Sequence, residues 1–307
     1  MTAIEEVGFD LMPGENLGIV GESGSGKSVT ALSILRLHAR ATTAIPKGRI
    51  LYEGRDLLTM PERELRAVRG GEIAMIFQDP MSSLNPVLTI ADQIAETLRL
   101  HQGLDGAAAR RRAIELLDLV RIADAPRRVD EYPHRLSGGM RQRVMIAIAI
   151  ACRPKLLIAD EPTTALDVTI QAQILELLRD LQAELGMSVI LISHDLGVIA
   201  EFAQRVLVMY AGRIVEQAGV RQLFRAPLHP YSDGLLAAVP RVDADTNRLP
   251  AIPGSIPDPA DPIPGCRFSP RCIEAVERCR IEAPALLAAG EGRLARCPPR
   301  VARGAAS

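Results

Sequence analysis

The chain has 307 residues, of which 48% are hydrophobic, so it can bury a substantial core and is not intrinsically disordered. A net charge of −1 argues against a globally basic nucleic-acid-binding protein. The longest apolar run, Val144 to Cys152, falls far short of the roughly 20 residues that span a bilayer. The first ten residues include two Glu and one Asp, so we expect no secretory signal.

Five apolar runs predict the strands of an α/β fold. They are Leu17–Val20, Ile73–Phe77, Leu156–Ala159, Val189–Ile192 and Val206–Tyr210, the last followed by a turn and Arg213–Val215. Because the runs are continuously apolar and separated by helices, we expect a sheet covered by helices on both faces. Polar residues follow several strand ends, where open α/β sheets place their ligands.

Helices are predicted over Ser28–Arg36, Ala91–Leu100 and Ala107–Leu119, and another begins at Ser137 and runs to about Ala151. We expect a domain over 1–225 with a helical subdomain inserted at about 88–152. After residue 225 the composition changes, with 13 of the 22 prolines and four of the five cysteines. Residues 226–307 are therefore predicted to form a small, loop-rich extension.

A glycine-rich loop lies between the first strand and the first helix. Its sequence, Gly21-Glu22-Ser23-Gly24-Ser25-Gly26-Lys27-Ser28, fits the phosphate-loop pattern G-x-x-x-x-G-K-[ST], and Val29 completes the predicted nucleotide-binding segment. The glycines let backbone N–H groups approach phosphates, Lys27 would reach the β- and γ-phosphates, and the Ser28 hydroxyl would coordinate Mg²⁺. A glycine-rich turn without function is the weaker interpretation in this strand–loop–helix context.

An acidic pair, Asp160-Glu161, ends the third predicted strand. Asp160 would hold Mg²⁺ through water, and Glu161 would polarise an attacking water. Alone, the pair could be an ordinary acidic helix start, but beside a phosphate loop it indicates hydrolysis. Gln78 could bind Mg²⁺ or the lytic water, and His194 could contact the γ-phosphate. From local sequence alone, a solvated glutamine and a structural histidine are the default interpretations.

A second potential anion site lies in Leu136-Ser137-Gly138-Gly139-Met140, because this turn leads into the N-terminus of a helix. One chain needs only one phosphate site to hold one nucleotide. We therefore predict that the second site binds a nucleotide that another chain holds, through Ser137, Gly138 and Gly139.

The ordered set of these motifs, with Ala165-Leu166-Asp167 after the acidic pair, resembles the ATPase subunit of ABC transporters over about residues 5–225. The resemblance implies a P-loop NTPase-type fold with a helical signature-motif subdomain, and ATP and Mg²⁺ as ligands. It implies that Ser137 and Gly139 bind the γ-phosphate on the opposing subunit, that Asp167 lies at the dimer interface and that His194 senses the γ-phosphate. The segment around Gln78 would face the membrane subunits.

A narrower resemblance is to the ATPases of dipeptide and oligopeptide importers. It rests on Gly24–Leu32, Tyr132-Pro133-His134, Thr163–Gln173, His229-Pro230-Tyr231, Ile252-Pro253-Gly254 and Gly265–Phe268. Because nickel importers are close relatives, nickel or another small solute is the alternative cargo. The implied partners are a second ABC ATPase subunit in a heterodimer, two membrane-spanning permease subunits and a solute-binding protein, with no nucleic acid. The implied location is peripheral, on the cytoplasmic face of the inner membrane.

Four cysteines lie in the tail: Cys266, Cys272, Cys279 and Cys297. Four thiolates could hold a [4Fe-4S] cluster or zinc, and some relatives are thought to carry an iron–sulfur cluster here. The spacings match no standard short motif, so cysteines that merely pack the loops are an equal alternative. Cys152 is expected in the core.

One departure from the family concerns adenine. Members usually carry, upstream of the segment corresponding to Val7-Gly8-Phe9, another strand and an aromatic residue that stacks on the base. Phe9 is expected in the strand that follows and is no obvious substitute. Either the start is truncated or misassigned, or the protein has lost adenine stacking, and in the second case nucleotide affinity could fall about tenfold or more.

Three rival classes remain. A soluble ABC ATPase acting on DNA or ribosomes would have long coiled-coil insertions or basic arms, and the segment between Lys27 and Ser137 contains neither. A P-loop kinase would not need the turn at Ser137. A non-catalytic binding subunit is disfavoured by the intact Lys27, Asp160 and Glu161.

Overall fold

The computed structural model describes residues 2–39, 43–164, 166–239, 251–261 and 263–304. The chain divides into two compact units. We call Met1–Leu11, Asn16–Thr30 and Leu191–Ser307 the glycine-loop unit, and Met12–Glu15 and Ala31–Ile190 the helical unit.

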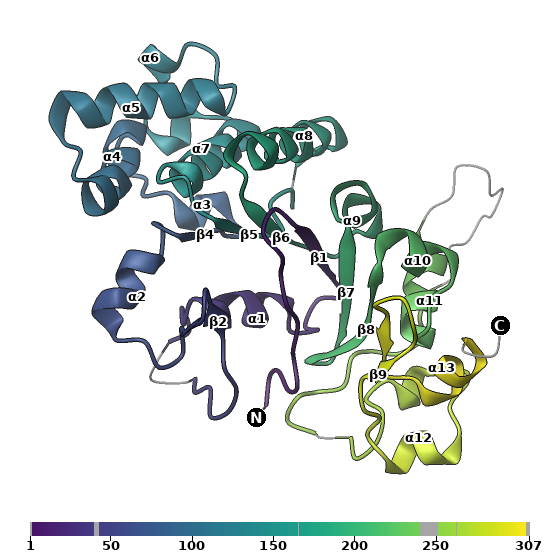
Figure 1. The fold of residues 1–307 in the computed structure, drawn as a ribbon. Coiled ribbons are helices and arrows are strands. Elements are labelled where there is room, and N and C mark those ends of the chain that lie inside the picture. The colour runs from purple at the N-terminus through teal and green to yellow at the C-terminus, as the bar shows by residue number, and fades with distance from the viewer. Residues whose placement is uncertain (1, 40–42, 165, 240–250, 262, 305–307) are drawn as a thin grey trace. The chain divides into compact units, whose positions relative to one another are not determined.

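The sheet of the glycine-loop unit is mixed. The first strand, β1 (Asn16–Val20), pairs in parallel with β7 (Arg205–Tyr210), and β7 pairs antiparallel with β8 (Arg213–Gly219). Two short strands from the tail, β10 (Leu294–Ala295) and β9 (Leu287–Ala288), continue the antiparallel order beyond β8 (Figure 1). Every residue of β1 is buried, as its apolar sequence predicts.

Short helices complete this unit. The helix α9 (Leu196–Phe202) packs on β1 so closely that a Cβ at Gly18 would lie 2.7 Å from Ile199 Cγ2. The remaining helices are α10 (Val220–Arg225), α11 (Pro230–Ala237), α12 (Glu277–Ile281) and α13 (Pro298–Gly304), with a 3-10 turn at Ser269–Arg271. The helix α1 (Lys27–Ile34) begins in this unit, directly after the glycine loop.

The helical unit contains two parallel strands, β4 (Ile73–Ile76) and β5 (Leu156–Asp160), in a register that sets Ile76 opposite Ala159. The strand β6 (Ser188–Ser193) starts in this unit. A two-stranded ribbon of β2 (Leu51–Tyr52) and β3 (Arg55–Asp56) precedes α2 (Glu62–Val68).

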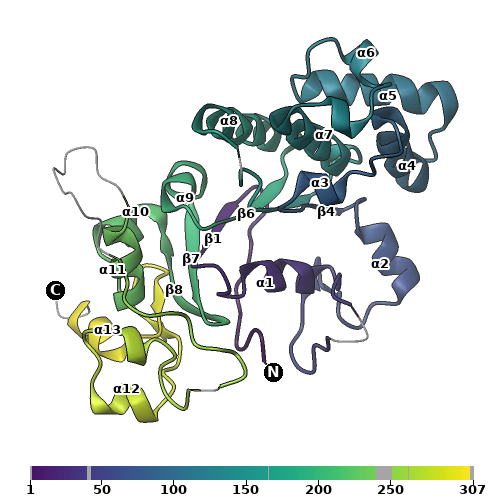
Figure 2. The same ribbon diagram turned by 180° about the vertical axis from the view of Figure 1, so that it is seen from behind.

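Most of the helical unit's helices lie between β4 and β5 in sequence (Figure 2). They are α3 (Pro80–Ser83), α4 (Ile90–Gln102), α5 (Gly106–Leu119), α6 (Ala125–Arg128), a 3-10 turn at Pro133–Arg135 and α7 (Gly138–Ile150), and α8 (Val168–Leu185) follows β5. A capping box between Thr89 and Asp92 starts α4, and Gly103, in the left-handed region at φ 65°, ends it. The helices α4, α5 and α7 pack on one another through buried aliphatic residues.

The five predicted strands and four predicted helices are confirmed, with small differences at their ends. The expected strand at Val7–Phe9 is wrong, because this segment has no regular secondary structure. The short strands β2, β3, β9 and β10 were not predicted, because two residues are too few to show a hydrophobic period. The domain boundaries at 225 and 226 stay a prediction. The described part of the chain has no helix with the length and hydrophobicity that a membrane crossing requires.

Candidate functional site

The glycine loop is shaped by close backbone approach. A Cβ at Gly21 would lie 2.2 Å from the carbonyl oxygen of Met209 on β7, so no other residue fits there without moving a strand. Gly24 and Gly26 have φ values of 82° and 103°, in the region that favours glycine. The loop then enters α1, whose first-turn N–H groups and dipole favour an anion.

Lys27, near the end of the glycine loop, is buried. Its ammonium donates to the carbonyl oxygens of Gly21, at 2.7 Å, and of Glu22, at 3.1 Å. Ser28, next along α1, is half-buried. The Lys27 ammonium is a compact charge held by backbone carbonyls beside the N-terminus of α1. Both the ammonium and the helix N-terminus favour phosphate oxygens, so the residues present suit a nucleoside triphosphate.

In the helical unit, Gln78 and Glu161 are brought together. Each lies two residues beyond the paired positions Ile76 and Ala159 of the parallel strands β4 and β5, so their side chains leave the same edge. Gln78 Nε2 donates to Glu161 Oε2 at 3.1 Å, and Thr164 Oγ1 donates to the same oxygen at 2.9 Å. The carboxylate of Glu161 is thus held in place by two donors.

The backbone at Glu161 is also unusual. Its φ is 47°, in a region that residues other than glycine rarely adopt, and such positions often occur at functional sites. Its neighbour Asp160 is buried, with 4% of its surface exposed. A buried carboxylate at a strand end offers the oxygen ligands that Mg²⁺ prefers. The predicted magnesium ligands are divided between units, with Ser28 in one and Asp160 and Gln78 in the other.

The turn at Ser137 starts α7. Ser137 Oγ accepts the N–H of Met140 at 3.3 Å, and Ser137 itself is exposed. A Cβ at Gly139 would lie 2.9 Å from Ile170 Cγ2, so glycine lets the first turn of α7 pack against the start of α8. Gly138 is half-buried, and a Cβ there would make only an ordinary contact, 3.6 Å from Leu166 Cδ2. Gly139 therefore has a packing role as well as the predicted role in anion binding.

Asp167 caps α8, because its Oδ1 accepts the N–H of Ile170 at 2.9 Å, and its side chain is exposed. Ala165, in the same motif, lies outside the described residues. His194 follows β6 directly and is exposed, and its neighbour Asp195 caps α9 by accepting the N–H of Gly197 at 2.7 Å. Capping thus gives both aspartates a structural role, while His194 lies at the strand end where its sequence position predicts it.

The four tail cysteines lie close together and are all free thiols. Burial, and after it the nearby Cys279, Cys272 and Cys297, raises the pKa of Cys266 to about 11, and the Cys266 N–H donates to the Cys279 carbonyl at 2.7 Å. Among the residues that the structure describes, no group of three or more His, Cys, Asp or Glu is arranged to hold a metal ion. Cys152, expected in the core, is only half-buried, and burial raises its pKa.

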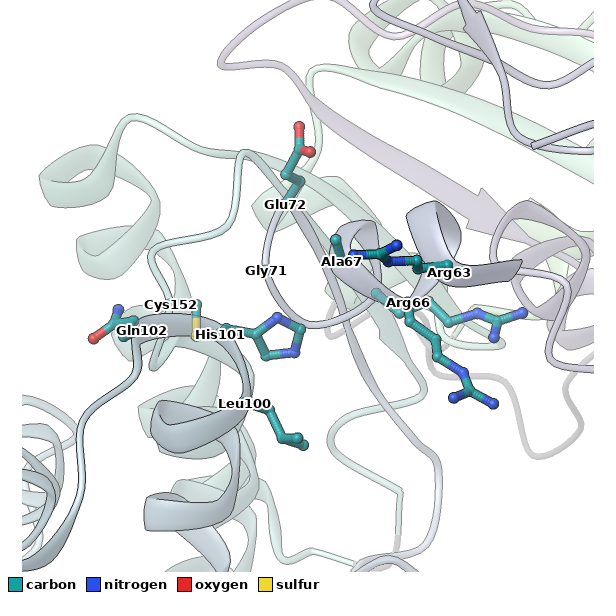
Figure 3. A pocket seen from close by; sticks show the side chains of 10 residues that line it. Arg63, Arg66, Ala67, Gly71, Glu72, Leu100, His101, Gln102 and Cys152 are labelled. Carbon is teal, nitrogen blue, oxygen red and sulfur yellow. The ribbon is translucent and has the colours of Figure 1, made fainter. Parts of the chain in front are cut away.

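A cavity of about 810 Å³ in the helical unit was not predicted from the sequence (Figure 3). None of the predicted site residues lines it. Its walls come from α2, the loop between α2 and β4, the end of α4 and the segment after α7. The lining residues are Arg63, Arg66, Ala67, Arg69, Gly71, Glu72, Leu100, His101, Gln102 and Cys152. Arg63, Arg66 and Arg69 follow one another at intervals of three residues, but the rest of the lining comes from distant segments whose meeting the sequence does not reveal.

Two family models match the chain. The model described as "ABC transporter" matches residues 4–164. The chain belongs to the ABC transporter family. A model described as "Oligopeptide/dipeptide transporter, C-terminal region" matches residues 215–279 of this family member. The predicted family resemblance, including its narrower form, is confirmed.

Relatives and solved structures agree with that membership. A putative peptide import ATP-binding protein of Brucella abortus (strain 2308) is 62% identical over 98% of this chain and 90% of its own length. The oligopeptide transport ATP-binding protein AppD of Bacillus subtilis (strain 168) is 54% identical over 96% of this chain and 90% of its own. The ATP-binding cassette MJ0796, in a dimeric post-hydrolysis state bound to ADP and Pi, matches with a TM-score of 0.63 and 31% identity, over 71% of this chain and 91% of that one. The predicted P-loop NTPase-type fold is confirmed.

Proposed function

We propose that this chain is the ATP-binding and ATP-hydrolysing subunit of an importer for dipeptides or oligopeptides. For the cargo, the main support is the match of residues 215–279 to the oligopeptide/dipeptide transporter C-terminal region, together with the names of the relatives. For the hydrolysis, the main support is the carboxylate of Glu161, which Gln78 and Thr164 hold at a strand end next to the buried Asp160.

Each residue has a defined task in the proposed reaction. The glycine loop and Lys27 bind and orient the phosphates, and Ser28 and Asp160 would hold Mg²⁺. Glu161 orients the attacking water and accepts its proton, and Gln78 keeps that carboxylate in position. When bound, Mg²⁺ would offset the negative charge of the phosphates. His194 completes the site as a γ-phosphate contact.

The turn at Ser137 is proposed to act on a nucleotide of a second subunit. Two ABC ATPase subunits would enclose two ATP molecules, each between one glycine loop and the other subunit's serine and glycines, with Asp167 at the interface. The similar cassette MJ0796 is a dimer in its post-hydrolysis state with ADP and Pi, which supports this arrangement. We propose a heterodimer, two membrane-spanning permease subunits, a solute-binding protein, no nucleic acid partner, and a peripheral place on the cytoplasmic face of the inner membrane.

We also propose that the four tail thiols bind a [4Fe-4S] cluster or zinc. The support is that all four lie in the extension, where the Cys266 N–H donates to the Cys279 carbonyl at 2.7 Å. Among the described residues the thiols are not arranged as a metal site, so binding would require them to move together. Anaerobic purification followed by metal analysis and visible absorption tests this. A chain without bound iron or zinc would refute it.

Purification of the chain from membranes, with mass spectrometry of its partners, tests the function. Two permease subunits and a solute-binding protein would support it, whereas recovery as a soluble complex with nucleic acid would refute it. Nickel or another small solute is the alternative cargo. Stimulation of ATPase activity in the purified complex by nickel-loaded rather than peptide-loaded binding protein would favour that alternative.

A further inference from the structure

The C-terminal extension reaches the second residue of the glycine loop. Arg271 Nη1 and Nη2 donate to the two carboxylate oxygens of Glu22 at 2.7 and 3.0 Å. The two residues are 249 positions apart in sequence but belong to the same unit. The Arg271 side chain is only 5% exposed and that of Glu22 is 31% exposed, so the arginine is shielded from water while the carboxylate keeps partial access to it.

Arg271 is itself fixed in one geometry. Its Nε donates to the carbonyl of Pro253 at 2.8 Å and its Nη2 to that of Ile252 at 3.2 Å. The guanidinium carbon lies 5.7 Å from the centroid of the Tyr210 ring, within range of a cation–π contact. The planar group therefore presents the same two donors to Glu22 without having to be ordered first.

A second residue of the extension holds the backbone of Glu22. The Tyr231 hydroxyl accepts the Glu22 N–H at 2.9 Å, and the Tyr231 ring is fully buried against Tyr210, with centroids 4.6 Å apart. The Glu22 carbonyl in turn accepts from Lys27 Nζ at 3.1 Å. One residue thus connects Arg271 and Tyr231 to the lysine of the loop.

Charge gives this connection a role beyond packing. A carboxylate in a loop that receives phosphates would repel them, and in a partly dehydrated site that repulsion is stronger than in water. A two-bond arginine partner neutralises the carboxylate and holds it against Arg271. If the pair only stabilised the fold, its loss would change stability and leave nucleotide affinity unaltered.

We propose that Arg271 is a positioning residue for the glycine loop: it neutralises the Glu22 carboxylate and holds that side chain in place, while Tyr231 holds the Glu22 backbone whose carbonyl accepts from Lys27. The C-terminal extension thereby sets the affinity of the loop for the phosphates of ATP. This inference rests on the proposed function for the identity of the ligand.

A charge-removal cycle on the full chain tests the proposal, with the Kd for MgATP measured by titration calorimetry. We expect R271Q to raise the Kd about tenfold, because the loss of a hydrogen bond to a charged group corresponds to roughly a tenfold change in an equilibrium constant. In the E22Q background the same substitution should change the Kd by less than about threefold, because no carboxylate is left to neutralise. R271K, which keeps the charge but loses the planar fork, should lie between R271Q and the wild type.

Arg300 supplies the matched control. It is also a shielded arginine of the extension, but it pairs with Glu274 and with Asp233, at 2.9 Å, away from the loop. R300Q should therefore bind MgATP like the wild type. Circular dichroism identifies any variant that fails to fold, and if R271Q does, the Kd values of R271K and of E22Q/R271Q decide.

Three results would count against the proposal. A wild-type Kd for a folded R271Q or R271K would overturn it. So would an R271Q effect on the Kd that is as large in the E22Q background as in the wild type, and both results would leave the proposed function intact. A wild-type chain that does not bind MgATP would overturn both.

Discussion

Stability at mildly acidic pH should depend on His229, the residue before α11. The ring is buried, its Nδ1 accepts the Tyr231 N–H at 3.1 Å, and it packs against Phe268. Burial, and after it the charge of Arg300, lowers the pKa of His229 to about 3, while Glu274 acts in the opposite direction. The folded chain therefore keeps this histidine neutral where the unfolded chain protonates it.

The sign and size follow from this difference. Because the folded pKa lies below the unfolded value of about 6.5, the stability that His229 contributes is present above pH 6.5 and is lost as the pH falls toward 3. Protonation of His229 lowers the free energy of the unfolded chain relative to the folded chain by about 1.4 kcal/mol for each pH unit below the unfolded pKa. Between pH 7 and pH 5 the expected loss from this residue is about 2 kcal/mol.

His229→Asn isolates the effect, because asparagine can still accept the Tyr231 N–H at the helix start but does not titrate. Urea unfolding at pH 7, 6 and 5, followed by circular dichroism, gives the free energy of unfolding for each protein. We expect the wild type to lose about 2 kcal/mol more than the variant between pH 7 and pH 5. His134→Asn, at an exposed position, should follow the wild type.

Other ionisable groups near the ring do not change this comparison. The Glu216 carboxylate accepts the His229 backbone N–H at 2.9 Å, and burial raises its pKa, but it is present in both proteins. Parallel pH profiles for wild type and His229→Asn would refute the reasoning, since they would mean that the folded state protonates His229 as readily as the unfolded chain does.

Substitutions at three further residues, Glu161, Gly21 and Asp167, probe the site. Glu161→Gln should bind ATP and lose about 100-fold or more in phosphate release, and turnover near that of the wild type would contradict the role of Glu161. Gly21→Ala places a Cβ 2.2 Å from the Met209 carbonyl and should cost about 1–3 kcal/mol in urea unfolding. Gly8→Ala, with nothing within 4 Å, should be neutral, and equal effects at the two glycines would rule out the clash. Asp167→Ala should cost about 1 kcal/mol through the lost cap of α8, whereas Asp167→Asn should keep the cap and weaken ATP-dependent dimerisation in sedimentation experiments. If Asp167→Asn dimerises with ATP as fully as the wild type, the aspartate has only its capping role.

Local patterns were sufficient to predict the longer strands and four helices, but α2, the long α8 and α9 were not predicted. Continuous apolar runs identified β1 and β5, and glycine spacing identified the loop from Gly21 to Ser28 before any fold was known. These signals are short-range, because a buried strand or a left-handed turn restricts the residues that form it. Two-residue strands such as β9 and β10 carry no such signal and were missed.

The tertiary structure alone decided which residues meet. The pairing of Gln78 with Glu161 depends on the register of β4 against β5, and neither segment by itself encodes that register. Gly139 is required by the approach of Ile170, which the motif around Ser137 does not reveal.

By itself, the sequence determined that this chain has a phosphate loop and an acidic pair, and it predicted a second anion-binding turn, because each motif is a contiguous run with its own chemistry. Only the tertiary structure showed that the tail holds the loop through Arg271, Tyr231 and Glu22. The local sequence around an arginine in a proline-rich tail, or around a glutamate in a glycine loop, does not indicate that the two residues pair. Their attraction acts through space, and the folding of 249 intervening positions is what brings them within hydrogen-bonding distance.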